Sequence, residues 1–131
     1  MAAKLPGVSF IIPVYNKAAY LPKVLAAIAA QTGDFPREFI FVDDGSTDDS
    51  LNLLRELTQG WKNLTILQQA NHGAAHATNR AIERASQPYL KFVDADDLLA
   101  APATEVLLSA LAPSDACLAY GGVYQIGRAH V

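Results

Sequence analysis

Four aspartates at the ends of two predicted strands are the residues of this sequence best suited to chemistry. Asp94 and Asp96 follow the apolar run 89–93, and a second pair, Asp43 and Asp44, follows another apolar run. In an extended chain, residues two positions apart point to the same side, so Asp94 and Asp96 can direct two carboxylates at one point. Mg²⁺ and Mn²⁺ bind such oxygen ligands and usually share them with phosphate groups. The pattern therefore predicts a divalent-cation site beside a phosphate-bearing ligand.

A simpler interpretation fits any one of these aspartates alone. Aspartate after a strand is a common turn residue or helix N-cap. Asp97 is predicted to be such a cap, pointing away from Asp94 and Asp96, because the apolar residues 98–100 follow it. Four acids at two strand ends nevertheless favour a site over a set of turns.

Strands and helices are predicted to alternate along the chain and to bring these aspartates to one edge of a sheet. Apolar runs predict strands at 8–12, 39–42, 64–67, 89–93 and 117–125. Helical spacing of apolar residues or alanines predicts helices near 21–28, 47–60, 74–86 and 102–111, the second of them started by a capping sequence at 46–49. This order predicts a mostly parallel sheet with helices on both faces, a three-layer α/β fold. Ligands of such sheets bind at the carboxyl ends of the strands, where the aspartates lie.

Local signals place the boundaries of these elements. Pro13 is predicted to stop the first strand, and Asn16 to cap the first helix. The buried face of the second helix is predicted to include Leu54, Leu57 and Trp61.

Size and composition indicate one globular domain. The chain has 131 residues, of which 51% are hydrophobic and 18% charged, and its net charge of −3 excludes an electrostatic surface for nucleic acid. The single cysteine, Cys117, cannot form a disulfide within the chain, which indicates a reducing, cytoplasmic setting. No apolar stretch has the length of a membrane span, although peripheral association of a longer protein with the inner face of a membrane stays open.

Several common site motifs are absent from the sequence. There is no P-loop, no G-x-S-x-G elbow, and no glycine in the first strand-to-helix turn, 13–19, that a dinucleotide fingerprint requires. His72 and His76 have a zinc-compatible spacing but no adjacent acid on their helix, and they are interpreted as solvent or pocket-edge residues. A flavodoxin-like phosphoacceptor domain would need a lysine at the end of a late strand, and 112–125 contains none.

Four segments, in this order and spacing, resemble the motifs of family 2 glycosyltransferases with the GT-A fold. They are Phe10–Lys17, Val42–Asp48, Asn71–Asn79 and Phe92–Asp97. The resemblance extends from about Val8 to Asp97. It implies a GT-A (Rossmann-like) fold and an enzyme, of the hexosyltransferase type, that transfers a sugar with inversion from a nucleotide-diphosphate sugar to an acceptor. It also implies dependence on Mn²⁺ or Mg²⁺ and a part in cell-wall or polysaccharide biosynthesis.

The resemblance further implies roles for individual residues. The implied nucleotide-sugar contacts are Pro13, Tyr15, Asp43, Asp44, Arg80, Asp94 and Ala95, and the implied metal ligands are Asp96 and Asp94. One or both of Asp43 and Asp44 would hold the nucleobase. The family often carries its arginine two positions earlier than Arg80, so for Arg80 a phosphate contact and a solvated helix position both stay open.

Family members place the acceptor site and the catalytic base beyond the region that matches this chain. The resemblance therefore implies that residues 1–131 form the nucleotide-sugar-binding part of a domain truncated at its C-terminus, with the base beyond Val131. A UDP-sugar is the commonest family donor, and the acceptor would be a saccharide or a lipid-linked molecule. The alternative is a non-catalytic nucleotide-binding or assembly module.

Overall fold

A parallel sheet of four strands forms the centre of the computed structural model, which describes residues 4–117 and residue 119. The strands are β1 (Val8–Val14), β2 (Arg37–Asp44), β3 (Leu64–Gln69) and β4 (Tyr89–Phe92). Their order across the sheet is β3-β2-β1-β4, so the chain starts in the middle, builds one side, and then crosses over to the other. The predicted strand at 117–125 falls almost wholly outside the described residues.

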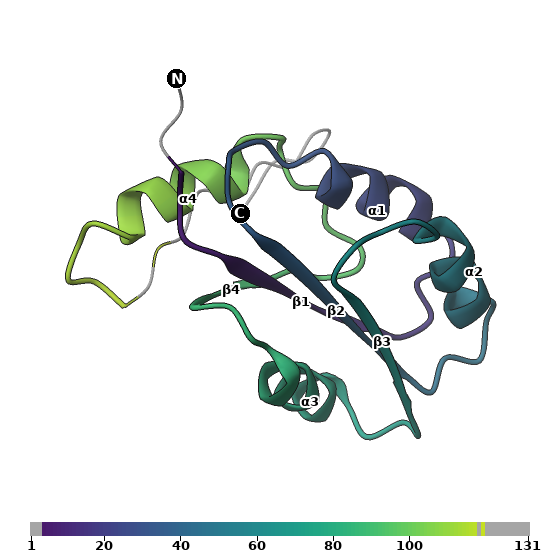
Figure 1. Cartoon of the computed structure of the whole chain (residues 1–131). Coiled ribbons are helices and arrows are strands. Elements are labelled where there is room, and N and C mark those ends of the chain that lie inside the picture. Colours follow the sequence, from purple (N-terminus) through teal and green to yellow (C-terminus); the bar gives the residue numbers. More distant parts are fainter. Residues whose placement is uncertain (1–3, 118, 120–131) are drawn as a thin grey trace, which may run out of the picture.

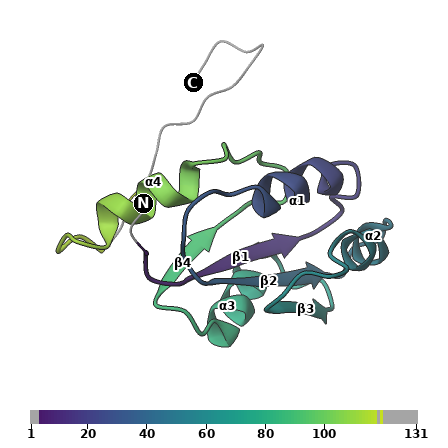
Figure 2. The same cartoon turned by 45° about the horizontal axis from the view of Figure 1, so that its top comes forward.

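Helices cover both faces of the sheet, which confirms the predicted three-layer α/β fold (Figures 1 and 2). Three of them, α1 (Leu21–Ala29), α2 (Ser50–Leu57) and α4 (Ala103–Leu111), lie on one face. The fourth, α3 (Ala74–Arg84), lies on the opposite face. Among the described residues, no helix has the length and apolar character needed to cross a membrane.

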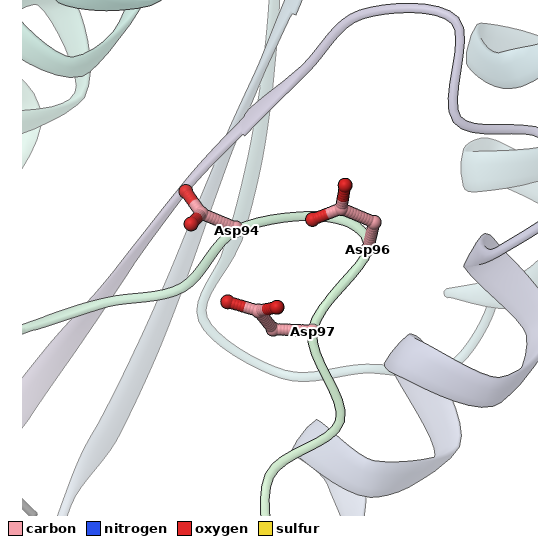
Figure 3. Close-up of side chains that lie close together, drawn as sticks. All are labelled: Asp94, Asp96 and Asp97. Carbon is pink, nitrogen blue, oxygen red and sulfur yellow. The ribbon is translucent and has the colours of Figure 1, made fainter. Parts of the chain in front are cut away.

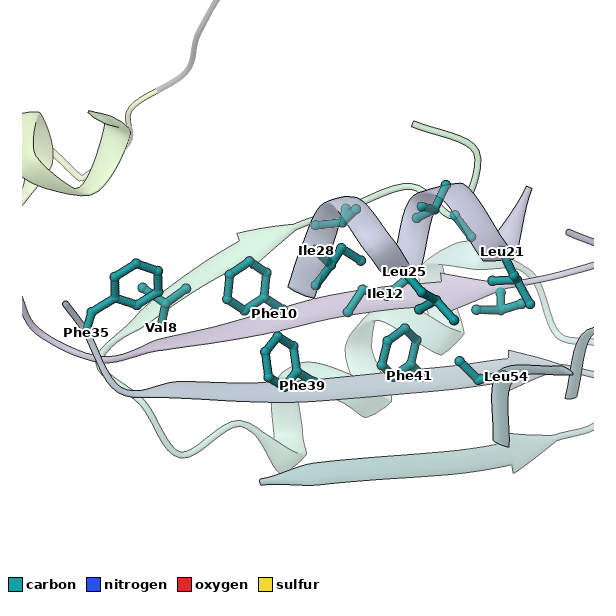
Figure 4. Packing of buried hydrophobic residues seen from close by; sticks show 14 of the residues in the cluster. Val8, Phe10, Ile12, Leu21, Leu25, Ile28, Phe35, Phe39, Phe41 and Leu54 are labelled. Atoms are coloured by element: carbon teal, nitrogen blue, oxygen red, sulfur yellow. The ribbon is translucent and has the colours of Figure 1, made fainter. Parts of the chain in front are cut away.

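Alternation along β2 shows how the sheet feeds two cores. Phe39 and Phe41 are buried against α1 and Leu54 of α2 (Figure 4). Ile40 and Val42 point the other way and pack with alanines of α3, whose small side chains let that helix lie close to the sheet. The same alternation carries two successive aspartates, Asp43 and Asp44, toward opposite faces at the strand end.

The first strand continues through Pro13 to Val14, so the prediction that Pro13 stops it is wrong. The carbonyl of Ile11 accepts a hydrogen bond from the N–H of Val93 on the β4 side (3.0 Å). Pro13 has the same orientation as Ile11, but β4 already ends at Phe92. Because no β4 carbonyl pairs with position 13 in the sheet, the missing proline N–H breaks no ladder bond.

Two helix boundaries also differ from prediction. The first helix begins at Leu21, with Tyr20 in the N-cap position, so Asn16 does not cap it. The second helix ends at Leu57, which is 37% exposed, and its buried residues are Ser50 and Leu54. Trp61 lies beyond the helix and packs edge-on against Phe39, with ring centroids 4.8 Å apart.

Candidate functional site

A pocket of about 470 Å³ lies at the carboxyl edge of the sheet, a volume typical of small-molecule sites. Its walls come from the end of β1 and the turn after it, the end of β2, the turn before α3, and the segment after β4. The predicted site residues that line it are Pro13, Tyr15, Asp44, Asp94, Ala95 and Asp96. Asp43 and Arg80, which were predicted with them, are not among its lining residues.

Asp44 lines the pocket with both carboxylate oxygens hydrogen-bonded, Oδ1 twice and Oδ2 once. Its Oδ1 accepts from Gln69 Nε2 and from the N–H of His72, both at 2.8 Å, and its Oδ2 accepts from the N–H of Gly73 at 3.0 Å. Burial alone would raise the pKa of Asp44, but these three donors outweigh it and hold the pKa below its usual value. The pocket therefore presents an ionised carboxylate fixed in orientation at the end of β2.

Asp43 is buried and does not line the pocket. The residue is 2% exposed, and its Oδ2 accepts from the N–H of Ser46 at 3.2 Å. Its Oδ1 is buried and has no hydrogen-bond partner among the described residues. Asp43 thus holds the turn after β2, while Asp44 faces the cavity.

Gly45 lets this turn approach the loop that supplies donors to Asp44. Its φ is +71°, and a Cβ at this position would lie 2.8 Å from the backbone nitrogen of Asn71. Only glycine fits both the left-handed conformation and the close backbone contact.

A set of hydrogen bonds that sequence reasoning missed joins the turn after β1 to the turn after β2. Asn16 Oδ1 accepts from the N–H groups of Thr47 (2.7 Å) and Asp48 (3.2 Å), while the Asn16 N–H donates to Ser46 Oγ (3.0 Å). We call this contact of residues 16 and 46–48 the latch. Asn16 has a φ of +50°, which asparagine tolerates better than most residues. The polar run 46–48 directly after Gly45 was the sequence signal for this contact.

The segment after β4 gathers three carboxylates (Figure 3). Oxygens of Asp94, Asp96 and Asp97 lie within 4.8 Å of one another. Asp97 was predicted to point away and cap the next helix, and this is wrong: α4 begins only at Ala103, with Pro102 in the N-cap position. A tight turn, closed by the Asp97 N–H donating to the Asp94 carbonyl at 3.1 Å, folds Asp97 back toward Asp94.

The like charges of this triplet change the pKa of one of its members. Burial and the neighbouring charges of Asp94 and Asp96 raise the pKa of Asp97. A bound cation would relieve that repulsion, and three carboxylates form a donor set suited to Mg²⁺ or Mn²⁺. Among the described residues, no other group of three or more His, Cys, Asp or Glu side chains lies close enough together to hold a metal ion.

Lys17 supplies a positive charge at the triplet. Its Nζ lies 3.1 Å from Asp96 Oδ2, and the two side chains are 33% and 40% exposed. The same ammonium lies 5.7 Å from the centre of the Tyr20 ring. Lys17 also lines the pocket, and no feature of its spacing had marked it as a site residue.

Arg80 and the two histidines lie beside the pocket, around Gln69. Arg80 Nη1 donates to the carbonyl of Gln68 (3.2 Å) and to Gln69 Oε1 (3.4 Å). His76 Nδ1 lies 3.1 Å from the same Gln69 oxygen, and the rings of His72 and His76 are 5.0 Å apart. Gln69 therefore connects this exposed cluster to Asp44, to which its amide nitrogen donates.

The model of glycosyl transferase family 2 matches residues 9–129 of the chain. The chain belongs to this family. It is 32% identical over 121 residues to glycosyltransferase GlyA of Streptococcus pneumoniae, and the aligned region covers 92% of this chain and 17% of that protein. It is 39% identical over 124 residues to a PGL/p-HBAD biosynthesis glycosyltransferase of Mycobacterium tuberculosis, covering 90% of this chain and 47% of that protein.

Solved structures of glycosyltransferases share the fold. TarS of S. aureus in complex with UDP matches with a TM-score of 0.72 and 29% identity, over 82% of this chain and 32% of TarS. A mannosyltransferase of Pyrobaculum calidifontis in complex with GDP-Man and Mn²⁺ matches with a TM-score of 0.67 and 28% identity, over 79% and 31% of the two chains. The fold is therefore GT-A, and the chain spans less than half the length of each of these four proteins.

Proposed function

We propose that this chain binds the donor of a sugar transfer, a nucleoside-diphosphate sugar, together with Mn²⁺ or Mg²⁺. The observation that carries the proposal is one pocket lined by both an ionised carboxylate, Asp44, and the acidic segment after β4. One end of the pocket thus offers recognition of a nucleobase, and the other offers a cation site for a diphosphate. Family membership supports a glycosyltransferase as the whole protein.

The nucleobase is expected between Tyr15 and Asp44. Tyr15 is 42% exposed at the pocket rim, so its ring is free to stack on a base. An ionised carboxylate can only accept hydrogen bonds, so Asp44 suits a base with a ring N–H, such as uracil, thymine or guanine. UDP is our first candidate, because TarS has been solved with UDP and with UDP-GlcNAc.

Asp96 and Asp94 are the proposed metal ligands, with Asp97 beside them. A divalent cation held there would neutralise the charge that develops on the leaving diphosphate. The chain's own contribution is to fix the donor: Asp44 orients the base, and Pro13 and Tyr15 form the adjoining wall. We propose that transfer inverts the configuration at the sugar, as the family resemblance implies.

The acceptor side of the reaction is proposed to belong to the further length that the relatives have. We propose that the acceptor is a saccharide or a lipid-linked molecule. We also propose a cytoplasmic location, in which the whole protein can associate with the inner face of the membrane. This chain alone is expected to bind donor without transferring sugar at a useful rate, because acceptor positioning and general-base catalysis contribute much of such a rate.

Calorimetric titration of UDP, GDP and dTDP tests the proposal, each with Mn²⁺ and again after excess chelator. We expect at least one of them to bind with Mn²⁺ and to lose most of its affinity on chelation. ADP serves as the control, since adenine has no ring N–H in its Watson–Crick edge to offer Asp44. Absence of binding by all three nucleotides to a chain that unfolds cooperatively on heating would overturn the proposal.

A further inference from the structure

The ammonium of Lys17 forms an ion pair with Asp96, one of the carboxylates that we propose as metal ligands. Its Nζ lies 3.1 Å from Asp96 Oδ2, and this is the one ion pair within 4.0 Å in the part of the chain that the structure describes. A divalent cation at Asp96 and the Lys17 ammonium cannot share that oxygen without strong repulsion between their charges. Metal binding through this oxygen would therefore displace the ammonium.

The backbone of Lys17 is fixed, whereas its side chain has room to turn. Its N–H donates to Ser50 Oγ at 2.8 Å, and its carbonyl accepts from the N–H groups of Tyr20 and Leu21 at 2.9 and 3.1 Å. The side chain is 33% exposed and lines the pocket. Displacement from Asp96 would thus leave the ammonium inside the same pocket, on an anchored stem.

A bound diphosphate adds new partners for a displaced ammonium. Lys17 is the one cationic side chain among the lining residues, while Asp44, Asp94 and Asp96 are all acidic. The diphosphate of a bound nucleotide brings new anionic oxygens into this space, and ammonium groups bind phosphate oxygens readily.

We propose that Lys17 is a positioning residue that exchanges partners: it holds Asp96 while the pocket is empty and turns to the diphosphate when a cation takes Asp96. This inference rests on the proposed function. It predicts that cation and nucleotide bind cooperatively. The cation releases the Lys17 ammonium for the diphosphate, and the diphosphate draws that ammonium away from Asp96. Mn²⁺ alone competes with the ammonium for Asp96, whereas with a diphosphate present the displaced ammonium can bind the phosphate oxygens.

Two titrations of Lys17→Met test the exchange. Methionine keeps the length of the stem and leaves the backbone bonds of the turn intact. An exposed ion pair of this kind contributes modestly, so Mn²⁺ alone should bind the variant about two- to fivefold more tightly than the unchanged chain. UDP in the presence of Mn²⁺ should bind the variant on the order of fivefold less tightly, because a charge-assisted contact to phosphate is lost.

Controls separate the exchange from general effects of charge and folding. Lys62→Met removes the same charge at the opposite end of the sheet and should change neither titration. Lys17→Arg keeps the positive charge and should restore UDP binding. Uridine, which has no phosphate, should bind the unchanged chain and Lys17→Met equally.

The outcomes are distinct. Unchanged or weaker Mn²⁺ binding by Lys17→Met would overturn the competition at Asp96. An equal loss of uridine and UDP affinity would show that Lys17 acts through the shape of the turn, and would overturn its contact with the diphosphate. If the unchanged chain binds Mn²⁺ but no nucleoside diphosphate, the proposed function fails, and the Mn²⁺ titration still decides whether Lys17 competes for Asp96.

Discussion

At the amino-terminal edge of the sheet Glu38 is surrounded by donors, whereas at the carboxyl edge the aspartates after β4 face one another. Glu38 Oε1 accepts from Ser9 Oγ (2.6 Å), from the N–H of Ser86 (2.8 Å) and from Ser86 Oγ (3.0 Å). Burial would raise the pKa of Glu38, but these hydrogen bonds outweigh it and lower the pKa. At Asp97 burial acts together with like charge, and the pKa rises.

The contrast separates a structural carboxylate from carboxylates available to a ligand. Glu38 fastens the segment between α3 and β4 to the start of the sheet, and its charge is satisfied by the protein itself. The triplet of Asp94, Asp96 and Asp97 gains little from its own neighbours apart from Lys17. Clustered like charges lower the stability of a folded protein, and such clusters are frequent at functional sites.

The largest effect is expected from Asp96→Asn. Asparagine keeps the size of the side chain and removes the charge that a hard cation requires. Even substitutions of residues behind metal ligands typically reduce metal affinity by about 10- to 100-fold, so Mn²⁺-dependent UDP binding should fall by at least tenfold. Calorimetry with fixed Mn²⁺ measures it, and Asp49→Asn, at an exposed acid before α2, is the matched control.

Asp97→Asn sharpens the same comparison. The structure places Asp97 within the triplet, so its substitution should also weaken Mn²⁺-dependent binding, though less than Asp96→Asn does. If Asp97→Asn left binding unaltered, the triplet would reduce to the Asp94 and Asp96 pair.

A smaller effect is expected at the latch, which ties the wall that carries Tyr15 to the turn after β2. Asn16→Gly permits the positive φ but removes the side-chain acceptor used by Thr47 and Asp48. Unfolding free energy should fall by about 1 kcal/mol, and UDP affinity by a few fold, because Tyr15 loses its support. Thermal unfolding and calorimetry measure the two changes, and an affinity that stays constant would confine the latch to folding.

At the amino-terminal edge, Glu38→Gln should change stability and not binding. Loss of the charged acceptor should lower the unfolding free energy by about 1 kcal/mol at pH 7, a value reduced for partial exposure. The folded state lowers the pKa of Glu38, so its ionised form stabilises the fold at pH values above the pKa of an unfolded glutamate, about 4.3. This stabilisation is lost as the pH falls from that value through the lower pKa of the folded state. The difference in Tm between the two chains should therefore shrink below about pH 4, while UDP affinity at pH 7 stays the same. A Tm difference that persisted at low pH would assign the effect to packing.

Sequence reasoning reached the strands and the acidic edge because both depend on local patterns. Apolar runs bounded by turn residues located β1 to β4, and parallel topology then required the strand ends to share an edge. The position of Asp97 could not be predicted, because it depends on a turn that only the packed segment after β4 fixes. Lys17 was missed for a related reason: it meets Asp96 across 79 residues of sequence, and no spacing rule connects two such positions.

The smallest effect on UDP affinity is expected from substitution of Arg80, which lies beside the pocket and does not line it. The family resemblance made it a candidate for the diphosphate, yet its guanidinium is engaged by the Gln68 carbonyl and the Gln69 side chain. In Arg80→Gln, Mn²⁺-dependent UDP affinity should therefore change by less than about twofold, within the range of an exposed charge.

Arg84→Gln, one turn further along α3, is the matched control for loss of a positive charge on that helix. A tenfold loss in Arg80→Gln alone would mean that the guanidinium leaves Gln69 and reaches the phosphates. Gln69 would then be released along with it, and because its amide donates to Asp44, base recognition would weaken as well. Uridine separates the two cases: its affinity falls if Asp44 is disturbed, and stays constant if Arg80 contacts phosphate alone.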